Sequence, residues 1–297
     1  MPANHQLRIL FVLNPVSGGR SKAEWESGIK NYYKDTEHTY ELYLTNGQND
    51  RSSLTHWIES WKPDRVVAVG GDGTLKLVAE ILASNEIPLG ILPAGSANGM
   101  ARELGLPASL EACLDIIMGD NIRKIDTIKI NGKDTCLHLS DIGLNAQLVK
   151  YFEENGWRGK LGYARGLLRV LINKKVLHVR IETEQESLIR DAFMVVLANA
   201  RMYGTGAMIN PKGNLEDGVF EVIIIRKLSI SAFMKILFRT RNFNPDKIEI
   251  LPAKSVVIEV KKKAYFQIDG EYKGQTKAIK AEVQKQVLPI MLPVTTT

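Results

Sequence analysis

The segment from Val66 to Thr74 constrains the fold most, because an apolar strand, a tight turn and a helix follow one another there without a gap. Val66 to Val69 are four consecutive small apolar residues, which is the pattern of a buried strand. The glycines of Gly70-Gly71-Asp72-Gly73 then let the backbone turn sharply and approach a ligand closely. From Thr74 onward the apolar residues recur with the helical period, at Leu75, Val78, Ile81 and Leu82.

A strand, a glycine turn and a helix N-terminus in this order form a cradle for phosphate, because free N–H groups and the helix dipole favour an anion. Asp72 lies inside this cradle. A carboxylate beside polyphosphate is repelled unless a cation bridges the two, so the turn predicts a Mg²⁺–nucleotide site. For a short glycine cluster taken alone, a βα turn without a ligand remains the alternative. The segment is not a P-loop, since no Gly-Lys-Ser/Thr follows.

Length and composition are those of a globular protein with about two domains. The net charge of +6 favours anionic partners, either a nucleotide or an acidic membrane face, and no nucleic-acid-binding motif is present. The charges are mostly interspersed along the chain, so ordinary solvated surface is the alternative for most of them. The first residues show no signal-peptide pattern, and no apolar run has the length of a membrane span. Cys113 and Cys136 lack metal or redox spacing. We therefore expect a cytoplasmic protein.

Residues 1–125 alternate predicted strands with helical stretches, which implies a parallel sheet covered by helices on both faces. The predicted strands are Ile9–Leu13, Tyr40–Leu44, Val66–Val69 and Leu89–Leu92. In such sheets ligands bind beyond the C-terminal ends of the strands. The glycine loops at 14–19, 70–73 and 93–96 fall at those ends.

Residues 126–297 predict a mostly antiparallel β domain. Asn131-Gly132, between apolar runs at Ile125–Ile130 and Thr135–Leu139, indicates a hairpin. Helical inserts are expected around Leu161–Ile172 and Ile230–Phe238, and the basic, apolar stretches 161–171 and 230–241 could contact a membrane or simply face the core. Further strands are predicted at Val176–Glu182, Phe193–Leu197, Val219–Ile225, Val256–Val260 and Tyr265–Ile268.

Four motifs occur in an order that resembles the diacylglycerol kinase catalytic-domain family, which includes soluble bacterial lipid kinases. They are Asn14-Pro15-Val16-Ser17-Gly18, Gly70–Thr74, Leu92–Asn98 and Ile268–Glu271. The resemblance covers nearly the whole chain. It implies the fold class α/β plus β: a Rossmann-like parallel-sheet nucleotide domain and a mainly antiparallel β-sandwich domain, with the active site in the cleft between them. The last dozen residues could pack back on the first domain.

The resemblance also implies roles for individual residues. Glu271 would be the general base that takes the proton from a lipid hydroxyl, and Asp72 would be the second catalytic residue. An ordinary hairpin turn is the alternative for Asp269-Gly270-Glu271, and an ordinary turn is the alternative for Ser17 and Ser96. The ATP site would be lined by Asn14, Pro15, Val16, Ser17, Gly18, Thr45, Gly71, Asp72, Gly73, Thr74, Leu75, Lys76, Leu77 and Ser96.

The segment Asn210–Gly218 resembles the family's proline-to-Asp-Gly loop, which holds a structural Mg²⁺. This implies Asp217 as the direct ligand, together with the carbonyl groups of Asn214 and Val219. Asp126 and Asp269 would be outer-shell partners. A hard cation that keeps several waters fits so sparse a set of oxygens. The alternative is an acidic turn before a strand.

The expected function is that of an ATP- and Mg²⁺-dependent lipid kinase. Its acceptor would be a hydroxyl of diacylglycerol or of a related lipid (a sphingoid base, ceramide or monoacylglycerol), reached by peripheral contact with a membrane, and a homodimer is compatible with the sequence. An NAD kinase is the first alternative, and the Asn14–Gly18 and Leu92–Asn98 segments disfavour it. A non-catalytic, membrane-associated nucleotide-binding regulator is the second, and the presence of both Asp72 and Glu271 disfavours it.

The chain departs from the family pattern at three places, which bear on the acceptor more than on the kinase chemistry. Lys76-Leu77 stands where members often have Asn-Glu. The Gly95-Ser96-Ala97-Asn98 loop leans toward the sphingosine and ceramide kinase branch. Gly19 separates Arg20 from the first glycine loop, which a basic residue often follows directly.

Overall fold

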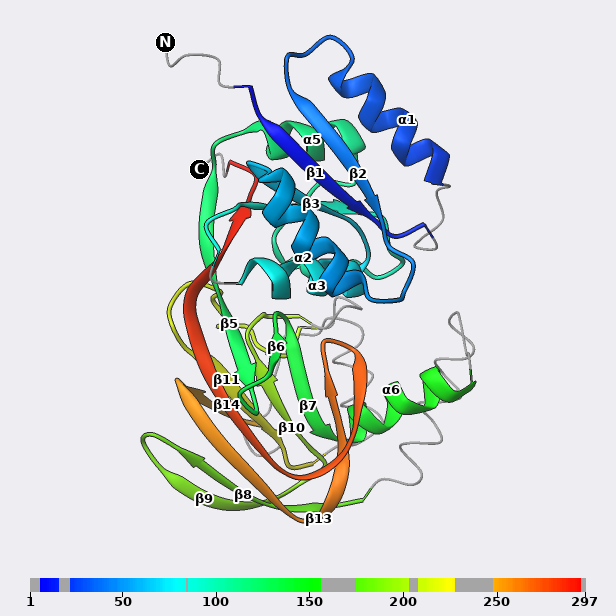
Figure 1. Ribbon diagram of the computed structural model, residues 1–297. Helices are drawn as coiled ribbons and strands as arrows, with labels where there is room; N and C mark the ends of the chain where they lie inside the picture. The colour runs from blue at the N-terminus through cyan, green and yellow to red at the C-terminus, as the bar shows by residue number, and fades with distance from the viewer. Residues whose placement is uncertain are drawn as a thin grey trace. The chain divides into compact units, whose positions relative to one another are not determined.

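The computed structural model describes residues 6–15, 22–83, 85–155, 175–202, 208–227 and 248–294 (Figure 1). The chain divides into two compact units. Unit 1 is Met1–Ile125 together with Gln286–Thr297, and unit 2 is Asp126–Lys285. The helices expected around Leu161–Ile172 and Ile230–Phe238 lie outside the described residues.

Unit 1 contains the parallel sheet that the sequence predicts. Its order is β14-β4-β3-β1-β2, and Ile290 of β14 lies opposite Leu89 of β4. All four predicted strands are confirmed. The strands are β1 (Arg8–Leu13), β2 (Thr39–Leu44), β3 (Arg65–Gly70), β4 (Leu89–Pro93) and the end of β14 (Glu271–Met291).

Helices cover both faces of this sheet (Figure 1). On one face, apolar side chains of α1 and α5 pack against β1, β3 and β4. On the other face, α3 packs against β3 and β4, and α2 packs beside α3. The helices are α1 (Lys22–Tyr33), α2 (Asp50–Trp61), α3 (Asp72–Leu82), α4 (Gly99–Glu103) and α5 (Leu110–Met118).

Strand β2 differs from its predicted pattern. The alternation of Tyr40, Leu42 and Leu44 predicts a single buried face, yet Leu44 is 39% exposed and Tyr43 is buried. The reason is that α2 covers the second face, where the rings of Tyr43 and Trp57 meet edge to face at 5.5 Å. Because both faces of β2 are covered, the burial of its side chains does not alternate as predicted.

Unit 2 is mostly antiparallel, as predicted, with the strand order β12-β11-β10-β7-β13-β14. Strand β8 pairs with β13, β9 with β8, and β5 with both β14 and β6. Helix α6 (Leu144–Asn155) follows β7 directly. The strands are β5 (Ile122–Ile130), β6 (Asp134–Cys136), β7 (Leu139–Gly143), β8 (Leu177–Thr183), β9 (Ser187–Ala192), β10 (Met194–Ala198), β11 (Phe220–Ile225), β12 (Ile248–Ala253) and β13 (Ser255–Ile268).

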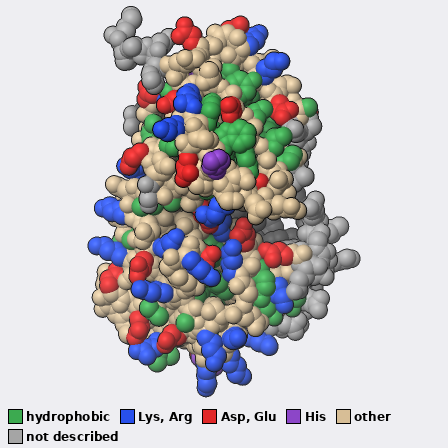
Figure 2. Space-filling model, in the orientation of Figure 1, with side chains coloured by type: hydrophobic (Ala, Val, Ile, Leu, Met, Phe, Trp, Pro, Cys, Tyr) green, Lys and Arg blue, Asp and Glu red, His purple; other side chains and the backbone are tan. Residues whose placement is uncertain are grey.

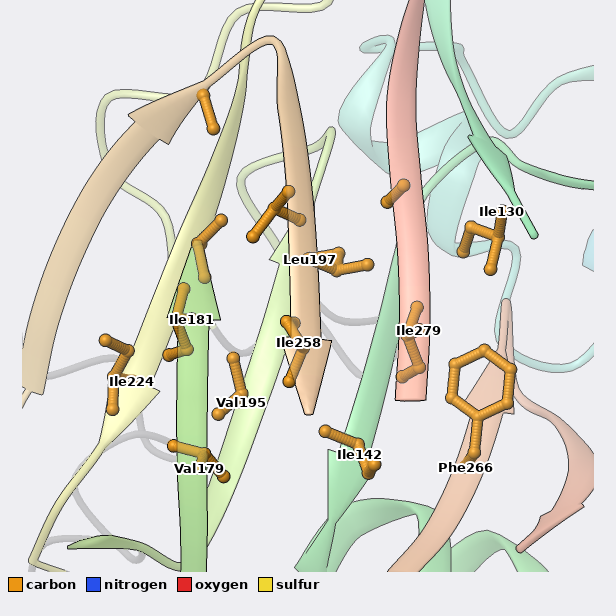
Figure 3. Packing of buried hydrophobic residues seen from close by; sticks show 14 of the residues in the cluster. Ile130, Ile142, Val179, Ile181, Val195, Leu197, Ile224, Ile258, Phe266 and Ile279 are labelled. Carbon is orange, nitrogen blue, oxygen red and sulfur yellow. The ribbon is translucent and has the colours of Figure 1, made fainter. Parts of the chain in front are cut away.

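The core of unit 2 follows the two-residue period of its strands. Val195 and Leu197 of β10 point into a large apolar cluster with Ile258 of β13 (Figure 3). Val196, between them, faces the other way into a smaller cluster that includes Leu148 of α6. The sheet is therefore buried on both faces at β10, which explains its unbroken apolar sequence.

The predicted hairpin at Asn131-Gly132 is confirmed, because β5 and β6 pair antiparallel on either side of it. The predicted extent of its second strand, Thr135–Leu139, is wrong, because the chain forms two strands there, β6 and β7. The break lies at Leu137 and His138. The carboxylate of Asp269 accepts hydrogen bonds from the backbone N–H groups of Leu137 (3.1 Å), His138 (2.9 Å) and Leu139 (3.2 Å). A side chain from a distant turn thus takes the donors that a continuous strand would have given to a neighbour.

Candidate active site

The loops that follow β1, β2, β3 and β4 share one edge of unit 1, because these strands are parallel. Backbone hydrogen bonds join the loops to neighbouring strands: Asn14 N–H to Val69 O (3.1 Å), Thr45 N–H to Leu13 O (3.0 Å) and Ala94 N–H to Gly70 O (2.9 Å). Of the residues assigned to ATP, the structure therefore brings Asn14, Pro15, Thr45, Gly71 to Leu77 and Ser96 to this edge. Val16, Ser17 and Gly18 lie outside the described residues.

Two glycine loops approach each other more closely than any side chain would allow. A Cβ placed on Gly95 would lie 2.4 Å from the Cα of Gly71. Asn98 fixes the Gly95 loop from within: its Oδ1 accepts from Gly95 N–H and its Nδ2 donates to Gly95 O, both at 2.8 Å. The shape of this loop is therefore stabilised by hydrogen bonds within the loop itself.

Asp72 joins these two loops. It is the first residue of α3, and its two carboxylate oxygens accept from the backbone N–H groups of Gly99 (3.0 Å) and Met100 (3.1 Å), at the start of α4. Each oxygen has a further lone pair, so the half-buried carboxylate can still face a cation. The predicted catalytic aspartate is thus also a structural link between the loops after β3 and β4.

The side chains of Thr74, Leu75 and Lys76 are buried in unit 1. The Thr74 hydroxyl packs against Gly70, where a Cβ would lie 2.2 Å from Oγ1, and this hydroxyl has no hydrogen-bond partner among the described residues. The N–H of Leu75 donates to Gly71 O (3.1 Å). The donors that α3 can offer an anion are therefore those of its first turn, at Asp72, Gly73 and Thr74.

Glu271 belongs to unit 2, directly after the turn of the β13–β14 hairpin. Asp269 (φ 51°) and Gly270 (φ 83°) are both left-handed, so the segment is the two-residue turn that Asp-Gly favours. This outcome agrees with the local alternative of an ordinary turn. The Glu271 carboxylate is nevertheless 47% exposed and lies 3.0 Å from Lys273 Nζ. It remains accessible to a substrate.

The predicted metal loop lies beside a buried carboxylate. Asp126 is fully buried, and its Oδ2 accepts from Gly218 N–H at 2.6 Å. Asp217 is exposed, and its Oδ1 accepts from Val219 N–H at 3.1 Å. Asn214 lies in the same turn, whereas the Asp269 carboxylate is bound by the backbone of residues 137–139.

Three polar residues near this turn were given no role by the sequence analysis: Asn199, Asn210 and Glu221. Asn199 Nδ2 donates to the carbonyl groups of Asp126 (2.9 Å) and Leu137 (2.8 Å), and Asn210 Nδ2 donates to the Glu221 carboxylate. Burial raises the pKa of Glu221, and the charge of Asp217 raises it further, whereas the bond from Asn210 opposes the shift. Asn199 immediately follows the apolar run of β10, a strand-end position that could have marked it.

This region of unit 2 fits a hard cation. The Oδ1 atoms of Asn199 and Asn210 are buried and lack hydrogen-bond partners among the described residues. Buried acceptors without donors are rare in proteins, and Mg²⁺ prefers oxygen ligands. Over the described ranges, no three Asp, Glu, His or Cys side chains group as a metal centre. A cation here would therefore need carbonyl or amide oxygens as well as carboxylates.

Comparison with known proteins finds family matches for both parts of the chain. The model of the diacylglycerol kinase catalytic domain matches residues 8–130, and that of the YegS C-terminal NAD kinase beta sandwich-like domain matches residues 140–296. A diacylglycerol kinase of Staphylococcus haemolyticus is 28% identical over 72% of this chain and 67% of its own length. A diacylglycerol kinase of Bacillus subtilis is 23% identical over 90% of each chain.

Solved structures share the fold. A putative diacylglycerol kinase from Bacillus anthracis superposes with a TM-score of 0.80 at 24% identity, covering 97% of this chain and 98% of its own. An NAD kinase from Archaeoglobus fulgidus superposes with a TM-score of 0.56 at 14% identity, covering 96% and 93%.

The chain has an α/β unit with glycine loops at its strand ends and a second, β-rich unit. It therefore has the fold class that diacylglycerol kinases and NAD kinases share. Within that class, the chain belongs to the diacylglycerol kinase catalytic-domain family. It is a lipid kinase, which takes its phosphoryl group from ATP.

Proposed function

We propose that this lipid kinase transfers the γ-phosphate of ATP to a hydroxyl group of diacylglycerol. The observation that carries the proposal is the similarity to the diacylglycerol kinase of B. subtilis, which extends over 90% of both chains and so includes both units. The first-turn N–H groups of α3 and the Gly95 loop then bind the phosphates of ATP. Their position at the C-terminal edge of a parallel sheet supports this role.

In the proposed reaction, Asp72 holds Mg²⁺ on the nucleotide and Glu271 acts as general base. The lipid oxygen attacks the γ-phosphorus, its proton passes to the Glu271 carboxylate, and the bond to ADP breaks with its electron pair going to ADP. Bound Mg²⁺ would neutralise charge that develops on the phosphates. The link that Asp72 makes to Gly99 and Met100 would fix its carboxylate for this task.

Phosphate transfer from labelled ATP to a panel of acceptors tests the proposal. The panel contains diacylglycerol, ceramide, sphingosine, monoacylglycerol and NAD, each presented with and without phospholipid vesicles. We expect diacylglycerol to be the preferred acceptor. Preference for ceramide or sphingosine would assign the chain to the branch that the Gly95–Asn98 loop suggests, and transfer to NAD would overturn the lipid acceptor altogether.

Peripheral contact with a membrane is part of the proposal, because the acceptor is a lipid. The basic, apolar stretches 161–171 and 230–241, which the sequence offers for this contact, lie outside the described residues. On the face shown in Figure 2, Lys and Arg side chains are mostly intermixed with Asp and Glu. Among the described helices, none combines the length and apolar character needed to cross a bilayer.

A structural Mg²⁺ at Asp217 predicts a change in stability that needs no substrate. Without nucleotide, Mg²⁺ at about a hundredfold excess over its Kd should raise the Tm of the wild-type protein by roughly 5 to 10 °C. Asp217→Ala should lower the Tm and abolish this gain, because it removes the one direct carboxylate ligand. Asp35→Ala is a matched control, since the Asp35 side chain is 85% exposed elsewhere. Equal Tm values for wild type and Asp217→Ala, with no gain from Mg²⁺ in either protein, would refute the proposed metal site.

A further inference from the structure

The two residues that flank Glu271 each donate a backbone hydrogen bond to a side chain of unit 2. Before Glu271, the backbone N–H of Gly270 donates to Oε1 of Gln267 at 2.7 Å. After Glu271, the backbone N–H of Tyr272 donates to Oε1 of Glu153, near the end of α6, at 2.9 Å. The backbone around Glu271 is therefore fixed by more than the hairpin ladder.

Gln267 can hold Gly270 only while its carboxamide points one way. The side chain is buried, and its Nε2 donates to the carboxylate of Asp141 in β7. Because Nε2 faces Asp141, the opposite atom Oε1 faces Gly270. A turned carboxamide would bring two donors, Nε2 and the Gly270 N–H, against each other.

Asp141 sets that direction because all of its hydrogen-bond partners among the described residues are donors. Besides Gln267, its carboxylate accepts from Asn145 Nδ2 (2.6 Å) and from the backbone N–H of Ala146 (2.8 Å) in the first turn of α6. Burial raises the pKa of Asp141 to about 6, whereas these three hydrogen bonds lower it because they stabilise the ionised form. The same carboxylate thus binds the start of the helix that carries Glu153.

We propose that Asp141 and Gln267 are positioning residues for Glu271: the Asp141 carboxylate orients the Gln267 carboxamide, which holds the turn in the place where Glu271 meets the lipid hydroxyl. The proposal rests on Glu271 being the general base of the proposed function. Neither side chain needs to touch substrate. Their effect passes through Gly270, and through α6 to Tyr272.

Two single substitutions break the order of donors and acceptors without changing volume. Asp141→Asn replaces one of the two acceptor oxygens by an N–H₂ group, although three donors converge on this side chain. Gln267→Glu places a second carboxylate against that of Asp141. Each should lower kcat about 10- to 100-fold, with an unchanged KM for ATP, because misplacing a catalytic group by about 1 Å costs rate rather than nucleotide binding.

The double variant Asp141→Asn, Gln267→Glu separates positioning from general damage. The amide introduced at position 141 then donates to one oxygen of the carboxylate introduced at position 267, and the other oxygen accepts from Gly270 N–H. Asn145 turns its carboxamide to accept the remaining N–H of that new amide. We expect kcat to recover most of its wild-type value. Additive losses in the double variant would overturn the proposal.

Amide hydrogen exchange measures the same link without substrate. Exchange at Gly270 and Tyr272 should be faster in each single variant and near wild type in the double variant, with the amides of the β5–β6 turn as internal reference. Unchanged exchange at both amides in the single variants would overturn the proposal. If the wild-type protein phosphorylates no lipid, the proposed function fails, and hydrogen exchange alone then tests whether Asp141 and Gln267 hold the turn at Gly270.

If Asp141→Asn does not fold, Gln267→Met carries the test. Methionine keeps the volume of the side chain, and Asp141 keeps its bonds from Asn145 and Ala146. Faster exchange at Gly270 with a reduced kcat and unchanged KM for ATP supports the role of Gln267. A folded Gln267→Met variant with wild-type kcat and exchange would refute it.

Discussion

Glu271→Gln is expected to lower kcat about 10²- to 10⁴-fold, the usual cost of removing a general base. Glutamine keeps the shape of the side chain but cannot accept the proton of the lipid hydroxyl. Loss of the ion pair with Lys273 should change stability little, since the Glu271 carboxylate is 47% exposed. Steady-state kinetics with saturating lipid, together with ATP binding by calorimetry, check this result.

Glu282→Gln is the matched control for this substitution. Glu282 lies on the same strand, β14, is also 47% exposed, and pairs with Lys280 at 2.8 Å, two residues away. It should keep wild-type kcat. A large loss of ATP affinity in Glu271→Gln with unchanged kcat would instead assign Glu271 to the nucleotide site, and the lipid hydroxyl would need another base.

Asp72→Asn should abolish turnover, with a loss of about 10³-fold or more, because charge neutralisation and positioning supply most of the catalysis in phosphoryl transfer. The asparagine keeps one oxygen for one of the two N–H groups, Gly99 or Met100, and loses the hydrogen bond to the other. Because Asp72 is only half-buried, the loss of this one bond should leave the protein folded. Activity at increasing Mg²⁺, with Tm measured in parallel, tests this expectation. Near wild-type activity at saturating Mg²⁺ would remove Asp72 from the mechanism.

The control for Asp72→Asn is Glu184→Gln. Glu184 is likewise a carboxylate that accepts from two consecutive backbone amides, those of Lys254 (2.8 Å) and Ser255 (3.2 Å), in a turn of unit 2. This control variant separates two effects on activity: the loss of a carboxylate that binds backbone amides, and the loss of a negative charge beside ATP. We expect Glu184→Gln to retain activity.

Unit 1 could be predicted closely because its signals are local. Apolar runs such as Ile9–Leu13 and the glycine turn at Gly70 mark strand ends directly, and parallel pairing then brings the loops together. The contacts made by the site residues could not be predicted in the same way. Asp72 binds amides that lie in a different loop, 27 and 28 residues further along the chain.

Unit 2 was predicted less well, because its edge strands carry weak signals. Strand β12 contains Pro252, which indicates a break in a central strand but is tolerated in β12, the end strand of the described order. Strand β9 exposes Ile189. The lysines, glutamates and glutamines of β14 hide its apolar alternation. Helix α6 was missed as well.

The buried polar contacts were the hardest to predict. Asp141 and Gln267 are 126 residues apart and meet only because β7 and β13 pair in one register. A polar residue within a strand is normally assigned to the solvent face. Asp269 raises the same difficulty, since its carboxylate splits the predicted strand Thr135–Leu139 from more than a hundred residues away.

The discontinuity of unit 1 has a consequence for synthesis on the ribosome. Its sheet is completed by the end of β14, where Ile290 pairs with Leu89 and the carbonyl groups of Leu292 and Pro293 accept from Asn121 Nδ2. These residues are translated after all of unit 2. Until then, β4 presents an open edge, the kind of surface that promotes intermolecular pairing. We therefore expect the parallel sheet of unit 1 to be completed only after unit 2 has been synthesised, so that the usual N-terminal-first order of folding does not hold for this last strand.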